Sequence, residues 1–87
     1  MTDTTEFFDE QTLLEMVENQ LADGHPLQVK ATLMRVVMKG TPRDEALQYI
    51  ACALGAELMA MEADQGPFNL TRYAEFLDSL PEMPWAE

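Results

Sequence analysis

Basic residues are scarce in this 87-residue sequence. Five Lys and Arg stand against 16 Asp and Glu, which gives a net charge of −11. Nucleic acids and anionic lipids both attract basic protein surfaces, so a chain with this charge is expected to be repelled by them. The sequence also lacks a run of about 18 apolar residues, which argues against a membrane-spanning helix. We therefore expect neither a nucleic-acid partner nor a membrane partner.

Cysteine and histidine each occur once, as Cys52 and His25. A single cysteine allows no internal disulfide. The first residues lack the basic and apolar segments of a signal peptide, so we expect a cytoplasmic protein. No Ser or Cys lies at an informative spacing from His25, and triad chemistry needs a base beside its nucleophile. The sequence thus predicts no catalytic residue, no metal site and no cofactor, and it favours a protein that is not an enzyme.

Glycine and proline separate four helical patterns, and 47% of the residues are hydrophobic, enough for a core. The links between the patterns are short, as in antiparallel helical neighbours. The sequence therefore predicts an all-α fold, a compact up-and-down bundle of four helices at about residues 10–22, 26–39, 42–64 and 70–80. We expect a loose acidic lead, a single helical domain and a proline-rich tail, over residues 1–8, 9–80 and 81–87.

The third predicted helix, residues 42–64, carries no charge from Ala46 to Ala56 and cannot be a surface helix. We expect it at the centre of the molecule, enclosed by its neighbours or by a second copy. Gly55 costs about 1 kcal/mol of helix propensity relative to alanine, so a packing reason is expected for it. Cys52 is predicted to be a small buried residue rather than a reactive thiol. The residues that should form a wide apolar stripe on one side are Leu47, Ile50, Ala51, Leu54, Leu58 and Met61.

The second predicted helix, residues 26–39, has apolar residues on both flanks of one narrow polar stripe. One flank contains Met34 and Met38, which we interpret as methionines that fill the core, with a methionine binding groove as the alternative. This helix is therefore expected to be largely buried, with Lys30 as an exception among apolar neighbours. The stripe itself consists of Gln28, Thr32, Arg35 and Lys39.

Glu57 is the most unusual polar residue, because helical spacing places it between the large apolar residues and a stripe of alanines. A carboxylate there either lies at the rim of the core or needs a partner, since an unpaired buried charge is costly. Lys30, Arg35 or His25 could supply that partner. Either the carboxylate forms a structural ion pair or it belongs to a functional polar cluster. The candidate cluster is Glu57, Glu18, Gln20, His25 and Lys30.

Trp85 follows Pro84 near the end of the sequence. It either packs over the bundle or acts as an anchor for a partner, because tryptophan is frequent among the residues that dominate binding energy.

A set of short motifs spreads over residues 12–80 and resembles a pattern in small bacterial helical proteins of unknown function. The resemblance implies a bacterial source and a helical fold, and it implies no activity. Some of those relatives have histidines near the positions of Asp44 and Gln48, which would suggest a metal site, but this chain has Asp and Gln there. The motifs are Glu18-Asn19-Gln20-Leu21, Pro26, Val29, Thr32-Leu33, Gly40, Arg43-x-Glu45-Ala46, Ile50 and Leu54-x-x-Glu57.

Three functions remain open from the sequence. The first is a non-catalytic module that binds another protein, or itself as a homodimer, through surplus apolar surface on the second and third helices. The second is a metal- or small-ligand-binding protein, or a minor enzyme, that uses Glu57. The third is an acidic mimic of nucleic acid, which requires one continuous face formed by Glu15, Glu18, Glu75 and Asp78.

Overall fold

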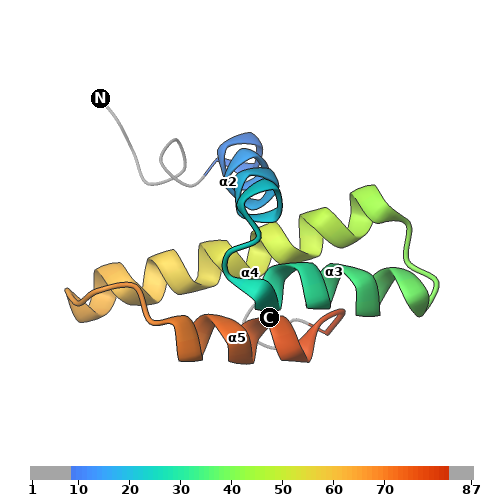
Figure 1. Cartoon of the computed structure of the whole chain (residues 1–87). Coiled ribbons are helices and arrows are strands. Elements are labelled where there is room, and N and C mark those ends of the chain that lie inside the picture. Colours follow the sequence, from blue (N-terminus) through green and yellow to red (C-terminus); the bar gives the residue numbers. More distant parts are fainter. Residues whose placement is uncertain (1–8, 83–87) are drawn as a thin grey trace.

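The computed structural model of the chain describes residues 9–82. These residues form α2 (Glu10–Asp23), α3 (Leu27–Met38), α4 (Arg43–Asp64) and α5 (Leu70–Ser79), and no strand occurs among them (Figure 1). The predicted all-α fold of four helices is confirmed, with each boundary within one residue of its expected place. The acidic lead and Trp85 lie outside the described residues.

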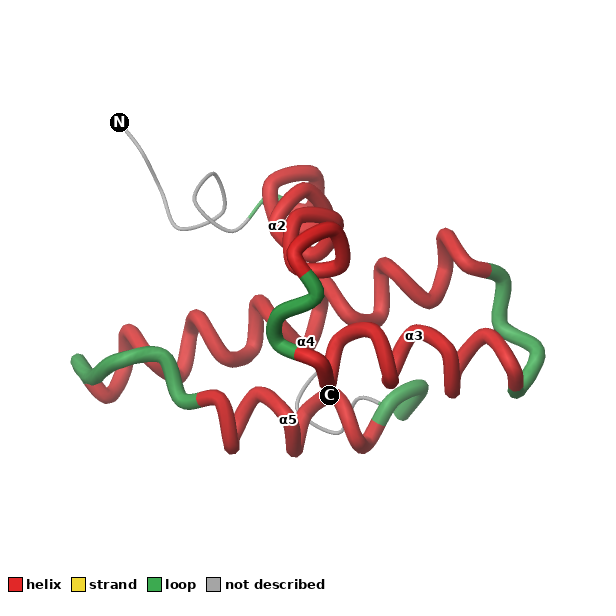
Figure 2. Tube along the Cα trace, viewed as in Figure 1, coloured by secondary structure: helices red, strands yellow, loops and turns green. Residues whose placement is uncertain are grey.

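Helix α4 is the longest helix and packs against α2, α3 and α5. In Figures 1 and 2, α3 and α5 run alongside α4 in the direction opposite to it, whereas α2 is seen nearly end-on and crosses them. The links are short, and the one between α4 and α5 turns through Gln65, which adopts a left-handed conformation with φ 56°. The contacts of α4 with α2, α3 and α5 confirm its expected central position.

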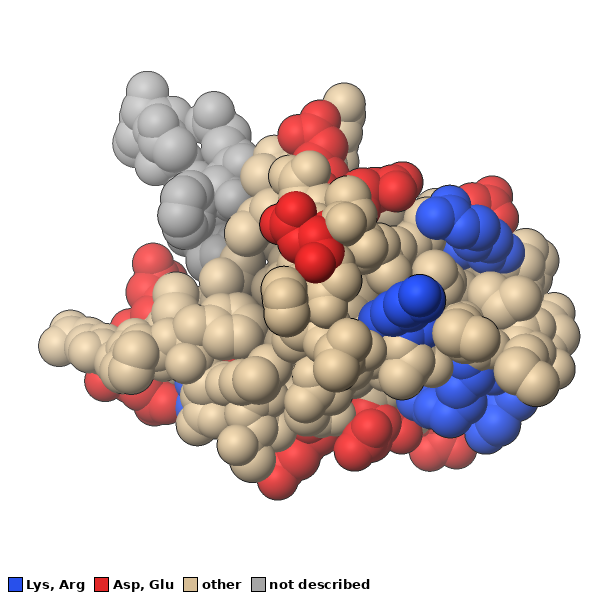
Figure 3. Space-filling view, viewed as in Figure 1, with Lys and Arg blue, Asp and Glu red and all other residues tan. Residues whose placement is uncertain are grey.

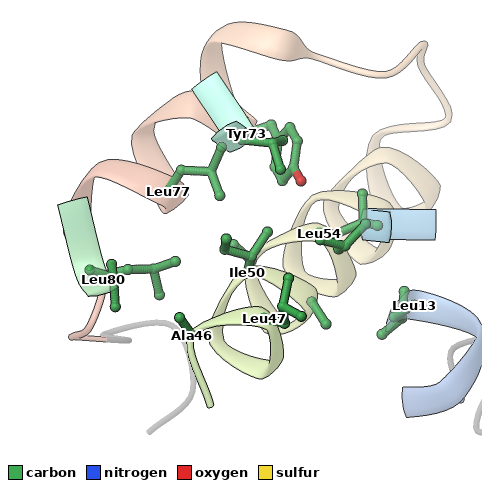
Figure 4. Close-up of a cluster of buried hydrophobic side chains, with 13 residues drawn as sticks. Leu13, Ala46, Leu47, Ile50, Leu54, Tyr73, Leu77 and Leu80 are labelled. Carbon is green, nitrogen blue, oxygen red and sulfur yellow. The ribbon is translucent and has the colours of Figure 1, made fainter. Parts of the chain in front are cut away.

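The core forms where α2 and α5 meet the middle of α4 (Figure 4). Leu47, Ile50 and Leu54 of α4 are buried, and Leu77 and Tyr73 of α5 point toward them. Leu58, one turn further along α4, is partly buried at the edge of the same cluster. Burial of apolar surface of this kind is the main favourable contribution to folding. The expectation that this part of α4 is enclosed is therefore confirmed, and the elements that enclose it are its neighbours in the same chain.

Gly55 lies where α2 crosses α4, and a Cβ atom built on it would be 3.2 Å from Leu13 Cδ1. This close approach is the packing reason for a glycine in mid-helix. We expect Gly55→Ala to change the free energy of unfolding by less than about 1 kcal/mol, because the gain in helix propensity offsets a small shift of Leu13. Gly55→Leu should destabilise by about 1–3 kcal/mol. Urea denaturation measures both free energies. The control is Ala63→Leu at the exposed end of α4. Equal destabilisation by Gly55→Leu and Ala63→Leu would contradict the packing role of Gly55.

Helix α3 is not largely buried, which corrects the expectation from its sequence. Only one side, with Val29, Thr32 and Val36, faces the core. Met34 and Met38 were expected in the core, but both are exposed. Helices α2, α4 and α5 all contact α3. Because the buried side of α3 is the one with Val29, Thr32 and Val36, the opposite apolar flank has no helix over it among residues 9–82.

Cys52 is also placed differently from the prediction, since its side chain is exposed on α4. Partial burial, and the nearby carboxylate of Glu10, raise the pKa of the Cys52 thiol. A raised pKa reduces the thiolate fraction, so partial burial and the Glu10 carboxylate support the expected low reactivity even though the side chain is not fully buried.

No helix within residues 9–82 is both long enough and apolar enough to cross a membrane.

Candidate functional site

The carboxylate of Glu57 is fully buried and accepts three hydrogen bonds. Arg72 donates from Nε to Oε1 over 2.6 Å and from Nη2 to Oε2 over 3.0 Å. The backbone N–H of Asn69 donates to Oε2 over 2.9 Å. Two parallel bonds from one guanidinium form the bidentate pair that arginine and carboxylate geometry favours. The buried charge is therefore matched by a cation and by a backbone donor.

The start of α5 places these donors. The side chain of Asn69 accepts a hydrogen bond from the backbone N–H of Arg72 over 3.0 Å and caps the helix. Arg72 then lies in the first turn of α5, opposite Glu57 in α4. Its Nη1 donates to Asp64 Oδ2 over 2.6 Å, at the end of α4. We call Glu57, Asn69, Arg72 and Asp64 the Glu57 network; it joins the α4–α5 loop to both helices.

Electrostatics in the network favour the ionised pair. Burial raises the pKa of Glu57, but the hydrogen bonds and charge of Arg72 and the N–H of Asn69 outweigh it, so its pKa lies below the ordinary value. The hydrogen bonds to Glu57 and Asp64 raise the pKa of Arg72. Both groups therefore stay charged at neutral pH. Within residues 9–82, no polar side-chain atom is both buried and without a hydrogen-bond partner.

The partner of Glu57 differs from the three that were expected. Arg72 pairs with it, while Arg35 donates to the carbonyl oxygens of Leu77 and Leu80 at the end of α5. Helical angle alone could not select Arg72, because that residue reaches Glu57 across the α4–α5 loop. One signal in the sequence bears on this pair, because Asn69 caps α5 and so fixes where that helix begins. The start of α5 in turn determines the direction in which the Arg72 side chain points.

The other members of the predicted cluster are not gathered around Glu57. Gln20 accepts a hydrogen bond from the buried Tyr73 hydroxyl over 3.0 Å, which ties α2 to α5. Burial raises the pKa of Tyr73. Glu18, His25 and Lys30 are exposed. The acids proposed for a nucleic-acid mimic, Glu15 and Glu18 on α2 and Glu75 and Asp78 on α5, are exposed as well.

A hollow of about 430 Å³ adjoins the network at the α4–α5 loop. Asp64 and Arg72 line it together with loop residues, but these two side chains already bind each other. Among residues 9–82, no group of three His, Cys, Asp or Glu side chains is placed to hold a metal ion. The geometry thus favours a structural role for the network.

A different surface stands out on α3. Leu27, Ala31, Met34 and Met38 follow one another at intervals of four, three and four residues, so they lie along one side of the helix. Leu27 is 69% exposed, Met34 54% and Met38 82%. We call these four residues the α3 apolar face. Exposed apolar side chains that form one continuous stripe are characteristic of interaction sites, whereas single ones are common on any surface.

A second hollow, of about 210 Å³, borders this face and is lined by Leu33, Met34, Val37 and Arg43. In Figure 3 most Lys and Arg side chains gather over the half of the molecule that holds α3 and the start of α4, with uncharged surface between them. An apolar stripe beside a small apolar hollow can hold a partner's side chain, which a flat exposed surface cannot do as well.

Comparisons of the chain with protein-family models, with curated proteins and with solved structures give no match. What the protein does must therefore be inferred from its own side chains, above all from the buried Glu57 network and the α3 apolar face.

Proposed function

We propose that the protein is a non-catalytic interaction module that binds a protein partner through the α3 apolar face. The observation that carries this proposal is the exposure of Leu27, Met34 and Met38 along one side of a helix whose opposite side is fixed in the core. Complete burial of each of these side chains by a partner would contribute about 1.5–3 kcal/mol of favourable free energy, which is absent while the side chain stays in water. A rigid helix that presents an apolar stripe is a common basis for helix-to-helix recognition.

The shape of the domain supports the proposal. Val29, Thr32 and Val36 hold α3 against the rest of the bundle, so the exposed face is presented without any change of fold. Preorganised surfaces lose less conformational entropy on binding than flexible ones do. Methionine adds adaptability, because its unbranched side chain fits irregular partner surfaces.

The ligand-binding alternative at Glu57 receives less support. Its carboxylate is fully buried and accepts three hydrogen bonds from Arg72 and Asn69. A ligand would have to displace these donors and supply equivalent ones. The network therefore favours holding the α4–α5 loop over binding a small molecule.

The proposal is tested by comparing a double variant of the face, Met34→Glu with Met38→Glu, with a matched double variant elsewhere, Met16→Glu with Met59→Glu. All four methionines are exposed, and both variants change the net charge equally. Affinity capture from the native cell extract, with quantitative mass spectrometry, should show partners that the wild type and the control retain. The face variant should lose those partners by about tenfold or more, because charged groups replace apolar contacts at the centre of the interface.

Circular dichroism checks that both variants keep the helical fold, and sedimentation detects self-association. The proposal also includes a homodimer, which would appear as a dimer in the wild type and in the control but not in the face variant. Equal capture by all three proteins, together with equal sedimentation as monomers, would contradict the proposal.

A further inference from the structure

The basic residues of this chain are concentrated around the α3 apolar face. Residues 30–45 contain Lys30, Arg35, Lys39 and Arg43, four of the five basic residues, and only two acids. Arg72 is the remaining basic residue, and the other 14 acids lie elsewhere in the sequence. A positive border of this kind is unexpected in a chain of net charge −11. Among the helices of residues 9–82, it coincides with α3, which leaves the apolar stripe of Leu27, Ala31, Met34 and Met38 exposed.

Helical spacing places cations on both sides of the stripe. Lys30 lies one turn after Leu27 and one turn before Met34, on the side of α3 that leads to Val37. Lys39 follows Met38 and lies on the opposite side of the stripe. Arg35 is on the same side as Lys39 but is directed to the end of α5, where it donates to the carbonyl oxygens of Leu77 and Leu80. Arg43 lines the hollow beside Met34. Lys30, Lys39 and Arg43 are exposed, and the structure gives none of these three an ion pair within residues 9–82.

We infer that the α3 apolar face binds an acidic amphipathic helix of a partner protein, an inference that rests on the function proposed above. The partner's apolar residues cover Leu27, Ala31, Met34 and Met38, and one of them enters the hollow beside Arg43. Its Asp or Glu side chains flank that stripe and meet Lys30 and Lys39. The exposed face spans the 12 residues of α3, which at 1.5 Å per residue is about 18 Å, or three turns of a partner helix.

Two other occupants fit the same observations less well. In a two-fold dimer through this face, each residue meets the same surface of the other copy, so the lysines of both copies would be brought together. An anionic membrane would also meet the cations of α3, but the net charge of −11 on the whole chain opposes its approach. A single helix contacts the basic border and little else.

The test uses two synthetic peptides of about 16 residues. Both carry leucines at positions i, i+4, i+7 and i+11; one has glutamates on both flanks of the stripe, and the other has glutamines. Isothermal titration of the full chain at physiological salt should show tighter binding of the glutamate peptide. Two exposed ion pairs should improve its affinity by about fivefold.

A matched pair of variants assigns the effect to its residues. Two double variants have the same net charge. One combines Lys30→Gln with Lys39→Gln, and the other combines Gln11→Glu with Asn19→Asp at exposed positions on α2. The first pair should abolish the preference for the glutamate peptide, and the second should leave that preference within about twofold of the wild type. A preference that both pairs reduce equally would reflect overall charge and would overturn the inference, as would tighter binding of the glutamine peptide.

The remaining outcomes are also decisive. Binding of vesicles of phosphatidylglycerol and phosphatidylcholine, with no binding of the glutamate peptide, would assign the face to a membrane and overturn the inference. A wild-type dimer that Met34→Glu with Met38→Glu dissociates would assign it to a second copy. If native partners require the methionines but not Lys30 and Lys39, the interaction function stands and the acidic partner does not.

Discussion

Replacing Arg72 with leucine is expected to lower the melting temperature by about 10–20 °C at neutral pH. The substitution removes both side-chain donors to Glu57 and leaves only the N–H of Asn69 on a fully buried carboxylate. Breaking a buried pair costs more than the pair contributes, because the remaining charge stays away from water. Thermal unfolding followed by circular dichroism measures the change.

The same variant should show a characteristic dependence on pH. In the wild type the pKa of Glu57 is lowered below 4.5, so its contribution is present above that pH and is lost as the pH falls through the lowered value. In Arg72→Leu the pKa of Glu57 should rise, because burial then acts without the arginine. The deficit relative to the wild type should therefore be largest at neutral pH and should shrink on acidification toward pH ~4. Measuring both proteins at each pH cancels the titration of the other acids.

Two controls separate the buried charge from lost packing. Adding Glu57→Gln to Arg72→Leu removes the charge, so the double variant should regain part of the melting temperature at neutral pH and lose the pH-dependent deficit. Asp64→Asn removes the charge from the exposed contact of the same arginine and should change the melting temperature by less than about 4 °C. An Arg72→Leu variant that is as stable as the wild type, or equally deficient at every pH, would show that the network holds no charge away from water.

The helix boundaries could be predicted because they depend on local chemistry. Gly24, Gly40 and the Gly66-Pro67 pair interrupt the pattern, and Asn69 caps the last helix with its own side chain. The central place of α4 could be predicted as well, since an uncharged stretch of that length must be covered by other elements. Both inferences use information that lies within a few residues of the position concerned.

Which flank of α3 is buried could not be predicted in the same way. Its apolar residues lie on both flanks of one polar stripe, so periodicity does not select between the flanks, and Thr32 of that stripe is itself buried. The choice depends on how α4 and α5 pack against it. Arg72 was missed as the partner of Glu57 for a related reason, because the two residues meet only after the α4–α5 loop closes. The candidate interface therefore emerged from the structure, although the sequence had indicated a surplus of apolar surface on this helix.

The central position of α4 leads to a second large expected effect, in which Leu54→Ala should reduce the free energy of unfolding by about 2–5 kcal/mol. Leu54 is 1% exposed in the core formed with α2 and α5, where truncation leaves a cavity that neighbouring side chains fill only in part. A domain of this size has a small margin of stability, so the variant is expected to be partly unfolded at 37 °C. Urea denaturation at low temperature measures the difference while the protein is still folded.

A graded series makes this prediction specific to burial. Leu70→Ala removes the same atoms from a side chain that is 44% exposed, so it should cost less than about 1 kcal/mol. Leu58→Ala, at the partly buried edge of the cluster, should fall between the two. Leu54→Met keeps nearly the same volume and should cost less than about 1.5 kcal/mol, which gives a measurable value even if Leu54→Ala does not fold. Equal losses at Leu54 and Leu70 would mean that burial does not set the cost of truncation and that α4 is not the centre of the core.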